Sequence, residues 1–135
     1  MWEPLSAEER VALNYIALQR IAEEAERRMG ILNLTNLGLM SLPPQLAELT
    51  HLEWLTLGSA VMFGTNSNRI VDLAPLSTLV RLRVLSFENQ EVSNLQSLSS
   101  LLELESIHME LSLVRDLTPL ATLGKLREIH CSGCT

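Results

Sequence analysis

The sequence predicts an α/β fold: a right-handed solenoid of repeated units, with a short-stranded parallel sheet on its concave face and a capping helix at its N-terminus. Two observations predict this fold. Hydrophobic residues make up 47% of the 135 residues but aromatic residues only 4%, because leucine is by far the most frequent residue. A core built largely of one side chain favours a repeating architecture, in which equivalent side chains stack from unit to unit. The second observation is an apolar pattern that recurs five times from Met29 onward.

Residues 6–29 have the spacing of one amphipathic helix. The apolar residues that we expect to face the repeats are Val11, Tyr15, Leu18, Ala22, Ala25 and Met29. Ser6, followed three residues later by Glu9, fits a capping box at the helix start. Gly30 lies where a helix would end. We therefore assign residues 1–30 to an N-terminal helical cap over the first repeat and residues 31–135 to the repeats, together forming one structural domain.

Five segments share the pattern LxxLxL, with apolar residues at the first, fourth and sixth positions. They begin at Met29, Leu52, Leu82, Leu104 and Leu126. The last two intervals between these starts are equal, the first is longer by one residue, and the second is longer by eight. Because side chains alternate along a strand, the fourth and sixth positions should face the core and the third and fifth should face solvent. Pro75 and Pro119 indicate short return helices, since proline in a first turn sacrifices no hydrogen bond.

These units resemble the leucine-rich repeat family over residues 29–135. The segments Asp72–Leu76 and Asp116–Leu120, both with the pattern Asp-Leu-x-Pro-Leu, are similar to the 22-residue repeats of bacterial internalins. The first unit is closer to ordinary bacterial repeats of the LxLPxxL type. The segment Cys131–Thr135 resembles the strand ends of some bacterial arrays. The resemblance implies a non-catalytic binding protein of bacterial origin.

The second unit is eight residues too long. Its register is restored at Asn68, so the extra segment is about residues 60–67. Met62 and Phe63 are apolar residues in this segment, where the repeat has no further core to fill. Two interpretations stay open: these side chains fold back over the sheet edge, or they bind a partner, since loops on rigid scaffolds commonly carry binding sites.

The register also places a graded set of side chains on the concave face, apolar at the N-terminal side and acidic with histidines at the C-terminal side. The predicted partner-binding residues, besides the two in the loop, are Trp54, Glu88, His108, Glu110, Glu128 and His130. A partly exposed tryptophan at such a place is typical of a binding hot spot. The alternative is a Trp54 ring that lies flat across Ile31 and Val84.

A zinc site is the other interpretation of the C-terminal side. His108 and His130 hold equivalent positions on adjacent strands, about 5 Å apart, and Cys131-x-x-Cys134 has the spacing of a zinc half-site. However, Cys131 holds a sixth position and should point into the core, away from His130. No second cysteine pair follows. We therefore predict no metal and no cofactor, and expect both cysteines to be thiols, with that of Cys134 at the surface.

Composition and motifs exclude several functions. A net charge of −6 provides no basic surface for nucleic acid. No apolar run approaches the roughly 18 residues of a membrane span, and the N-terminal segment lacks the basic and apolar stretches of a secretory signal. A cytoplasmic location is therefore expected. The sequence has no glycine-rich phosphate loop, Gly-x-Ser-x-Gly or His-Glu-x-x-His motif, so no catalytic residue is predicted.

The predicted function is a non-catalytic recognition module that presents its concave sheet and its inserted loop to an unidentified protein partner. Two alternatives stay open. The chain could be the sensor or substrate-recognition part of a larger enzyme of GTPase or ligase type, with the chemistry elsewhere. It could also be a structural protein that self-associates through an open C-terminal edge, because the fifth strand has a partner on one side only.

Overall fold

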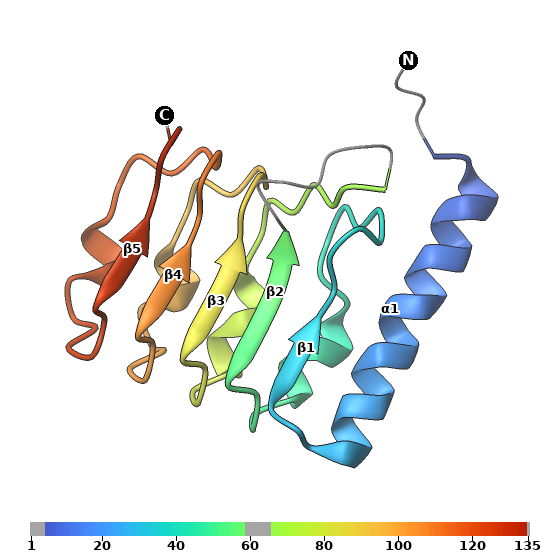
Figure 1. Cartoon of the computed structure of the whole chain (residues 1–135), viewed down its shortest axis with the longest axis horizontal. Helices are drawn as coiled ribbons and strands as arrows, with labels where there is room; N and C mark the ends of the chain where they lie inside the picture. The colour runs from blue at the N-terminus through green and yellow to red at the C-terminus, as the bar shows by residue number, and fades with distance from the viewer. Residues whose placement is uncertain (1–4, 59–65, 135) are drawn as a thin grey trace.

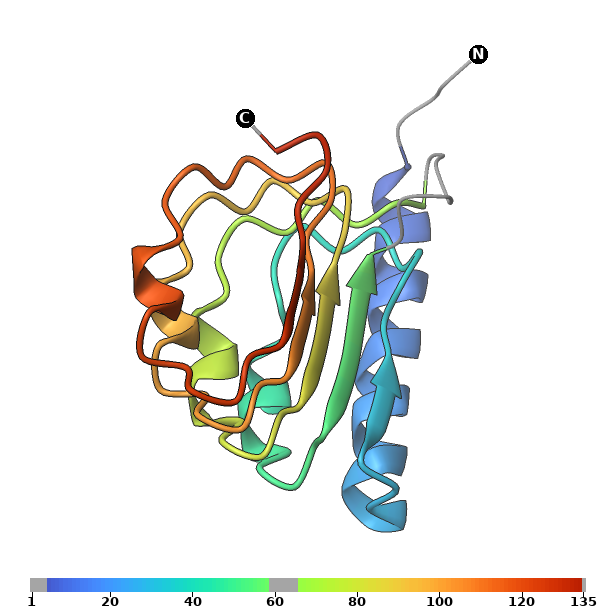
Figure 2. The same cartoon turned by 60° about the vertical axis from the view of Figure 1, so that its left-hand side comes forward.

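The computed structural model describes residues 5–58 and 66–134, which form one α-helix and one five-stranded parallel sheet (Figure 1). The strands lie in chain order: β1 (Ile31–Asn33), β2 (Trp54–Gly58), β3 (Val84–Phe87), β4 (Ser106–His108) and β5 (Glu128–His130). Short 3-10 helices carry the chain back on the opposite side (Figure 2): η1 (Pro44–Glu48), η2 (Ala74–Thr78), η3 (Gln96–Leu98) and η4 (Thr118–Leu120). The predicted α/β solenoid is confirmed.

Strand pairing follows the register of the repeats. Val84 lies opposite Ser106 and Ser106 opposite Glu128, so paired residues are one repeat length apart. Trp54 lies opposite Val84, and the separation of these two residues along the chain is eight residues longer than the regular repeat. The extra residues therefore fall between β2 and β3. The register of the repeats therefore continues across the insertion for Trp54, Leu55 and Thr56, and it shifts at the end of β2, where Gly58 lies opposite Phe87. Met62 and Phe63 lie outside the described residues.

The core consists of the predicted inward positions. At the fourth and sixth positions of the first four units, no side chain is more than 5% exposed. These residues are Leu32, Leu34, Leu55, Leu57, Leu85, Phe87, Ile107 and Met109. Burying one such side chain contributes about 1.5–3 kcal/mol. The fifth unit differs, because Ile129 at its fourth position is 43% exposed.

Four polar or sulfur-bearing side chains recur at the same position of successive units and form a column that is buried or packs against the core. Its members are Asn68, Gln90, Ser112 and Cys134. The Asn68 Oδ1 accepts hydrogen bonds from the amides of Leu37 and Leu39, at 3.1 and 2.9 Å. The Asn68 Nδ2 donates to the carbonyls of Leu34 and Leu57, at 2.6 and 2.7 Å. One buried amide thus satisfies four backbone groups of the first two units.

Helix α1 (Ala7–Arg27) lies beside β1 at one end of the sheet (Figure 1). The capping box is confirmed: the Ser6 hydroxyl accepts from the Glu9 amide and the Glu9 carboxylate accepts from the Ser6 amide, both at 3.1 Å. The helix ends before Gly30, because Arg28 already adopts a left-handed conformation with φ of 51°. Among the described residues, no helix is long and apolar enough to cross a membrane.

The predicted apolar stripe of this helix is wrong. Val11 and Tyr15 are 71% and 61% exposed, and the buried residues are Ala17, Ile21 and Glu24. The predicted row with Val11 and Tyr15 and the buried row with Ala17 and Ile21 both have helical spacing, so spacing alone does not show which row faces the repeats. Ala17 is fully buried, because its small side chain lets the helix approach the first repeat closely.

Candidate functional site

The N-terminal half of the concave face is apolar. Ile31 and Trp54 are 60% and 49% exposed, and they pair in register across β1 and β2. Together with half-buried Val84 they line a shallow hollow of about 300 Å³. The structure therefore brings Trp54 and its two neighbours together on one surface, as the sequence predicts. The role of Trp54 as a binding hot spot stays a prediction.

A charged network that was not predicted from the sequence lines part of this hollow. Arg83 contacts the carboxylates of Glu105 at 2.5 Å and Glu53 at 3.5 Å. The hydrogen bond from Arg83 holds the pKa of Glu105 below its ordinary value. The signal was present in the sequence, since Arg83 and Glu105 occupy equivalent positions in adjacent units.

Five of the predicted binding residues form one cluster in the C-terminal half. The rings of His108 and His130 are stacked, with centroids 4.3 Å apart and planes inclined by 5°. The Nδ1 atom of His108 lies 3.8 Å from Glu88 Oε1, and that of His130 lies 3.8 Å from Glu110 Oε1. The Nε2 atom of His130 lies 3.2 Å from Glu128 Oε2. We call these five residues the His–Glu cluster.

Ser106 borders the His–Glu cluster and was not predicted as a site residue. Its hydroxyl lies 3.0 Å from Nε2 of His108. The two residues are two positions apart in β4, so their side chains share a face of the sheet. That alternation would have identified Ser106 from the sequence.

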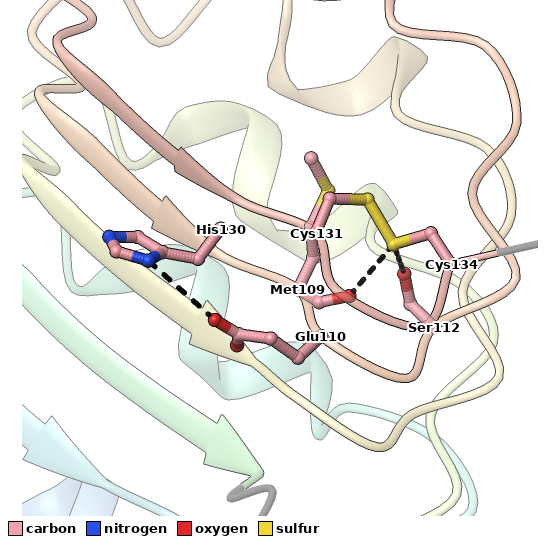
Figure 3. Close-up of a disulfide and its surroundings, with 6 residues drawn as sticks. All are labelled: Met109, Glu110, Ser112, His130, Cys131 and Cys134. Carbon is pink, nitrogen blue, oxygen red and sulfur yellow. Dashed lines mark hydrogen bonds and ion pairs between the residues drawn. A yellow bond between two sulfur atoms is a disulfide. The ribbon is translucent and has the colours of Figure 1, made fainter.

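The prediction of free thiols is wrong, because Cys131 and Cys134 form a disulfide (Figure 3). Cys134 is half-buried, and its sulfur lies 3.3 Å from the Met109 carbonyl and 3.5 Å from the Ser112 hydroxyl. A tight turn with Gly133 at φ of 76° brings the two Cα atoms to 5.5 Å, within the range that a disulfide spans. Cys134 therefore faces inward, in the same column as Ser112.

A second concavity lies between α1 and η1, with a volume of about 460 Å³. Leu18, Ala22 and Ala25 line it, so part of the predicted helix stripe faces a groove instead of the core. Beside it, buried Glu24 and His51 contact each other at 2.7 Å. Glu24 also accepts from the Gly30 amide at 2.7 Å. This pair fixes the helix to the first unit.

Comparison with known proteins places this geometry in a class. No protein-family model and no curated protein matches the chain. The solved structure of internalin C2 from Listeria monocytogenes is similar, with 29% identity and a TM-score of 0.64, over 76% of this chain and 43% of that one. The ectodomain of the Arabidopsis thaliana receptor kinase GASSHO1/SCHENGEN3, solved with CASPARIAN STRIP INTEGRITY FACTOR 2, is similar with 21% identity and a TM-score of 0.52, over 76% and 15%.

The parallel sheet, the return helices and these similarities define a leucine-rich repeat protein. Within that class the chain is internalin-like. It spans less than half the length of internalin C2.

Proposed function

We propose that the chain is a non-catalytic protein-binding module and that its partner docks on the concave face of the sheet. The observation that carries the proposal is the graded surface itself. Ile31 and Trp54 are exposed at one side, and the carboxylates of the His–Glu cluster lie at the other. Strands hold these groups in place, so binding has a small ordering cost. A matching partner has an apolar centre beside basic residues.

Similarity to leucine-rich repeat proteins supports protein recognition in general. The inserted loop with Met62 and Phe63 stays part of the proposal as a second contact for the same partner. Bacterial origin and a cytoplasmic location are proposals as well. The disulfide weighs against the cytoplasm, since disulfides persist in oxidising compartments. Alkylation of Cys131 and Cys134 in intact cells, followed by mass spectrometry, tests the location.

The test compares matched surface variants in affinity capture from an extract of the source organism. Trp54→Ser removes a concave side chain, and Leu102→Ser removes one of similar exposure, 57%, on the turn between η3 and β4. We expect Leu102→Ser to retain the wild-type partner and Trp54→Ser to lose about tenfold or more, as hot-spot truncation does. Equal recovery by all three proteins would contradict docking on the concave face.

A further inference from the structure

We propose that the concave face carries a site for one divalent transition-metal ion, with His108 and His130 as nitrogen ligands and Glu128 as an oxygen ligand. This inference goes beyond the proposed protein recognition and does not depend on it, because the site is built from side chains of this chain alone. Zn²⁺ is the probe that the ligand set favours, since zinc takes imidazole nitrogen and carboxylate oxygen.

The three side chains are already close enough to converge on one ion. One ligand atom of each lies within 4.8 Å of those of the other two. In a zinc site with bonds of about 2.0–2.2 Å, ligand atoms are about 3.3–4 Å apart. His130 and Glu128 are exposed and His108 is half-buried, so side-chain rotations supply the remaining movement without a change in the sheet.

The sheet presents the two imidazoles side by side. His108 and His130 are paired in register across β4 and β5, and their rings are nearly parallel, 4.3 Å apart. The lone pair of an imidazole nitrogen lies in the plane of its ring, so the stacked rings must turn about their side-chain torsions before both nitrogens point at one ion. Both side chains reach solvent, which leaves room for this rotation. Imidazole is the commonest protein ligand for metals.

A carboxylate beside the two histidines provides a second and independent observation. Glu110 Oε2 is buried, and among the buried side-chain oxygen and nitrogen atoms of the described residues it is the one without a hydrogen-bond partner. Leaving a buried carboxylate oxygen unpaired is unfavourable. Glu110 also groups with Glu88 and His108, with ligand atoms within 4.8 Å of one another. A cation on the neighbouring histidines would offset this negative charge.

The cysteines have no part in the proposed site. Both sulfur atoms are held in the disulfide, and Cys134 faces inward toward Met109 and Ser112 (Figure 3). The site therefore differs from a Cys–His zinc site. Reduction would create two new thiolate ligands, so the experiment must keep the protein oxidised.

The test is calorimetric titration of the oxidised full chain with Zn²⁺, without reductant or chelating buffer. We expect one ion per chain. His108→Gln, His130→Gln and Glu128→Gln should each weaken binding at least tenfold, because the loss of even an outer-shell partner costs about 10–100-fold. Glu103→Gln is the matched control, since this carboxylate pairs with Lys125 away from the cluster; it should bind as the wild type does. Cys131→Ser/Cys134→Ser should also bind normally.

A second measurement needs no variant. Zn²⁺ should shift the ring NMR signals of His108 and His130 and leave those of His51 unchanged, since His51 is buried against Glu24. Three results would each overturn the proposal: no saturable binding up to millimolar Zn²⁺, wild-type affinity in His108→Gln/His130→Gln, or loss of binding in the cysteine double variant.

Discussion

A single side chain, Asn68, ties together the part of the solenoid that the insertion interrupts. Its amide reaches the backbone of the first unit at Leu34, Leu37 and Leu39 and of the second at Leu57. It is 2% exposed, so water cannot replace these hydrogen bonds. After the inserted segment, the chain is therefore held at Asn68 by side-chain hydrogen bonds as well as by the apolar packing around it.

Asn68→Ala should lower the free energy of unfolding by about 3 kcal/mol or more, because several buried backbone groups lose their partners at about 1–3 kcal/mol each. Urea denaturation followed by circular dichroism measures this. Asn14→Ala, on the exposed side of α1, is the control and should change stability by less than about 0.5 kcal/mol. Equal effects would mean that the Asn68 network does not stabilise the fold.

Electrostatics at the residue scale is tested at Glu105. Its pKa lies below the ordinary value of 4.5, chiefly because Arg83 donates a hydrogen bond to the carboxylate. A lowered folded-state pKa means that the stabilisation is present above the unfolded pKa and is lost as pH falls through the folded one. Arg83→Gln should raise the pKa of Glu105 toward 4.5, as NMR titration of its side-chain carbon would show. An unchanged titration would rule out Arg83 as the cause.

At the scale of elements, repetition made the strands predictable. The alignment of five segments shows which positions recur as apolar and therefore face inward. A unit with an irregular sequence can still be assigned, because the other four define the pattern. Helix α1 occurs once, so its orientation had no such support. Helical spacing predicts more than one apolar row on this helix, and the row with Ala17 and Ile21 is the buried one, where α1 contacts β1 and η1.

The placement of the His–Glu cluster was predictable for the same reason as the strands. Equal repeat positions place His108 beside His130. The disulfide was not predicted, because it depends on the turn at Gly133 that brings Cys134 inward. The contact between Glu24 and His51 joins helix α1 to the first repeat. Because the helix is not itself a repeat, no other unit indicates such a contact in the sequence.

The corrected helix orientation leads to a direct comparison of two positions. Ile21→Ala should destabilise the fold by about 2–4 kcal/mol, since Ile21 is 4% exposed in the core cluster. Val11→Ala removes an apolar side chain that is 71% exposed and should change stability by less than about 0.5 kcal/mol. Thermal and urea unfolding of both variants measures the difference. The opposite order would restore the stripe that the sequence predicted.

At the scale of the whole molecule, the two edge strands of the sheet, β1 and β5, have different surroundings. Helix α1 lies against β1, while β5 pairs only with β4 among the described strands. Every residue of β5 is exposed, and Ile129 is 43% exposed at a position that is buried in the other units. Exposed strand edges favour pairing with another chain.

We therefore expect the chain to self-associate through β5 at micromolar concentration. Sedimentation velocity should show a dimer or larger species for the wild type and a monomer for Ile129→Lys, because the lysine places a charge in the contact. Val80→Lys, at a side chain 50% exposed on the turn before β3, is the control and should still associate. A monomeric wild type would contradict this use of the edge.

Three surface ion pairs join equivalent positions of adjacent units: Arg69 with Glu91, Arg83 with Glu105, and Lys125 with Glu103. The second, third and fourth units are thus linked to their neighbours by pairs of opposite charge at equivalent positions. Because the sign of the charge alternates from unit to unit, a tandem duplication of one repeat would place Arg83 beside a second Arg83 and Glu103 beside a second Glu103. A duplication of the two-unit segment 82–125 would instead keep opposite charges adjacent, in step with the apolar packing. The array can therefore lengthen in one genetic event without redesign of its interfaces, by two units and two strands at a time.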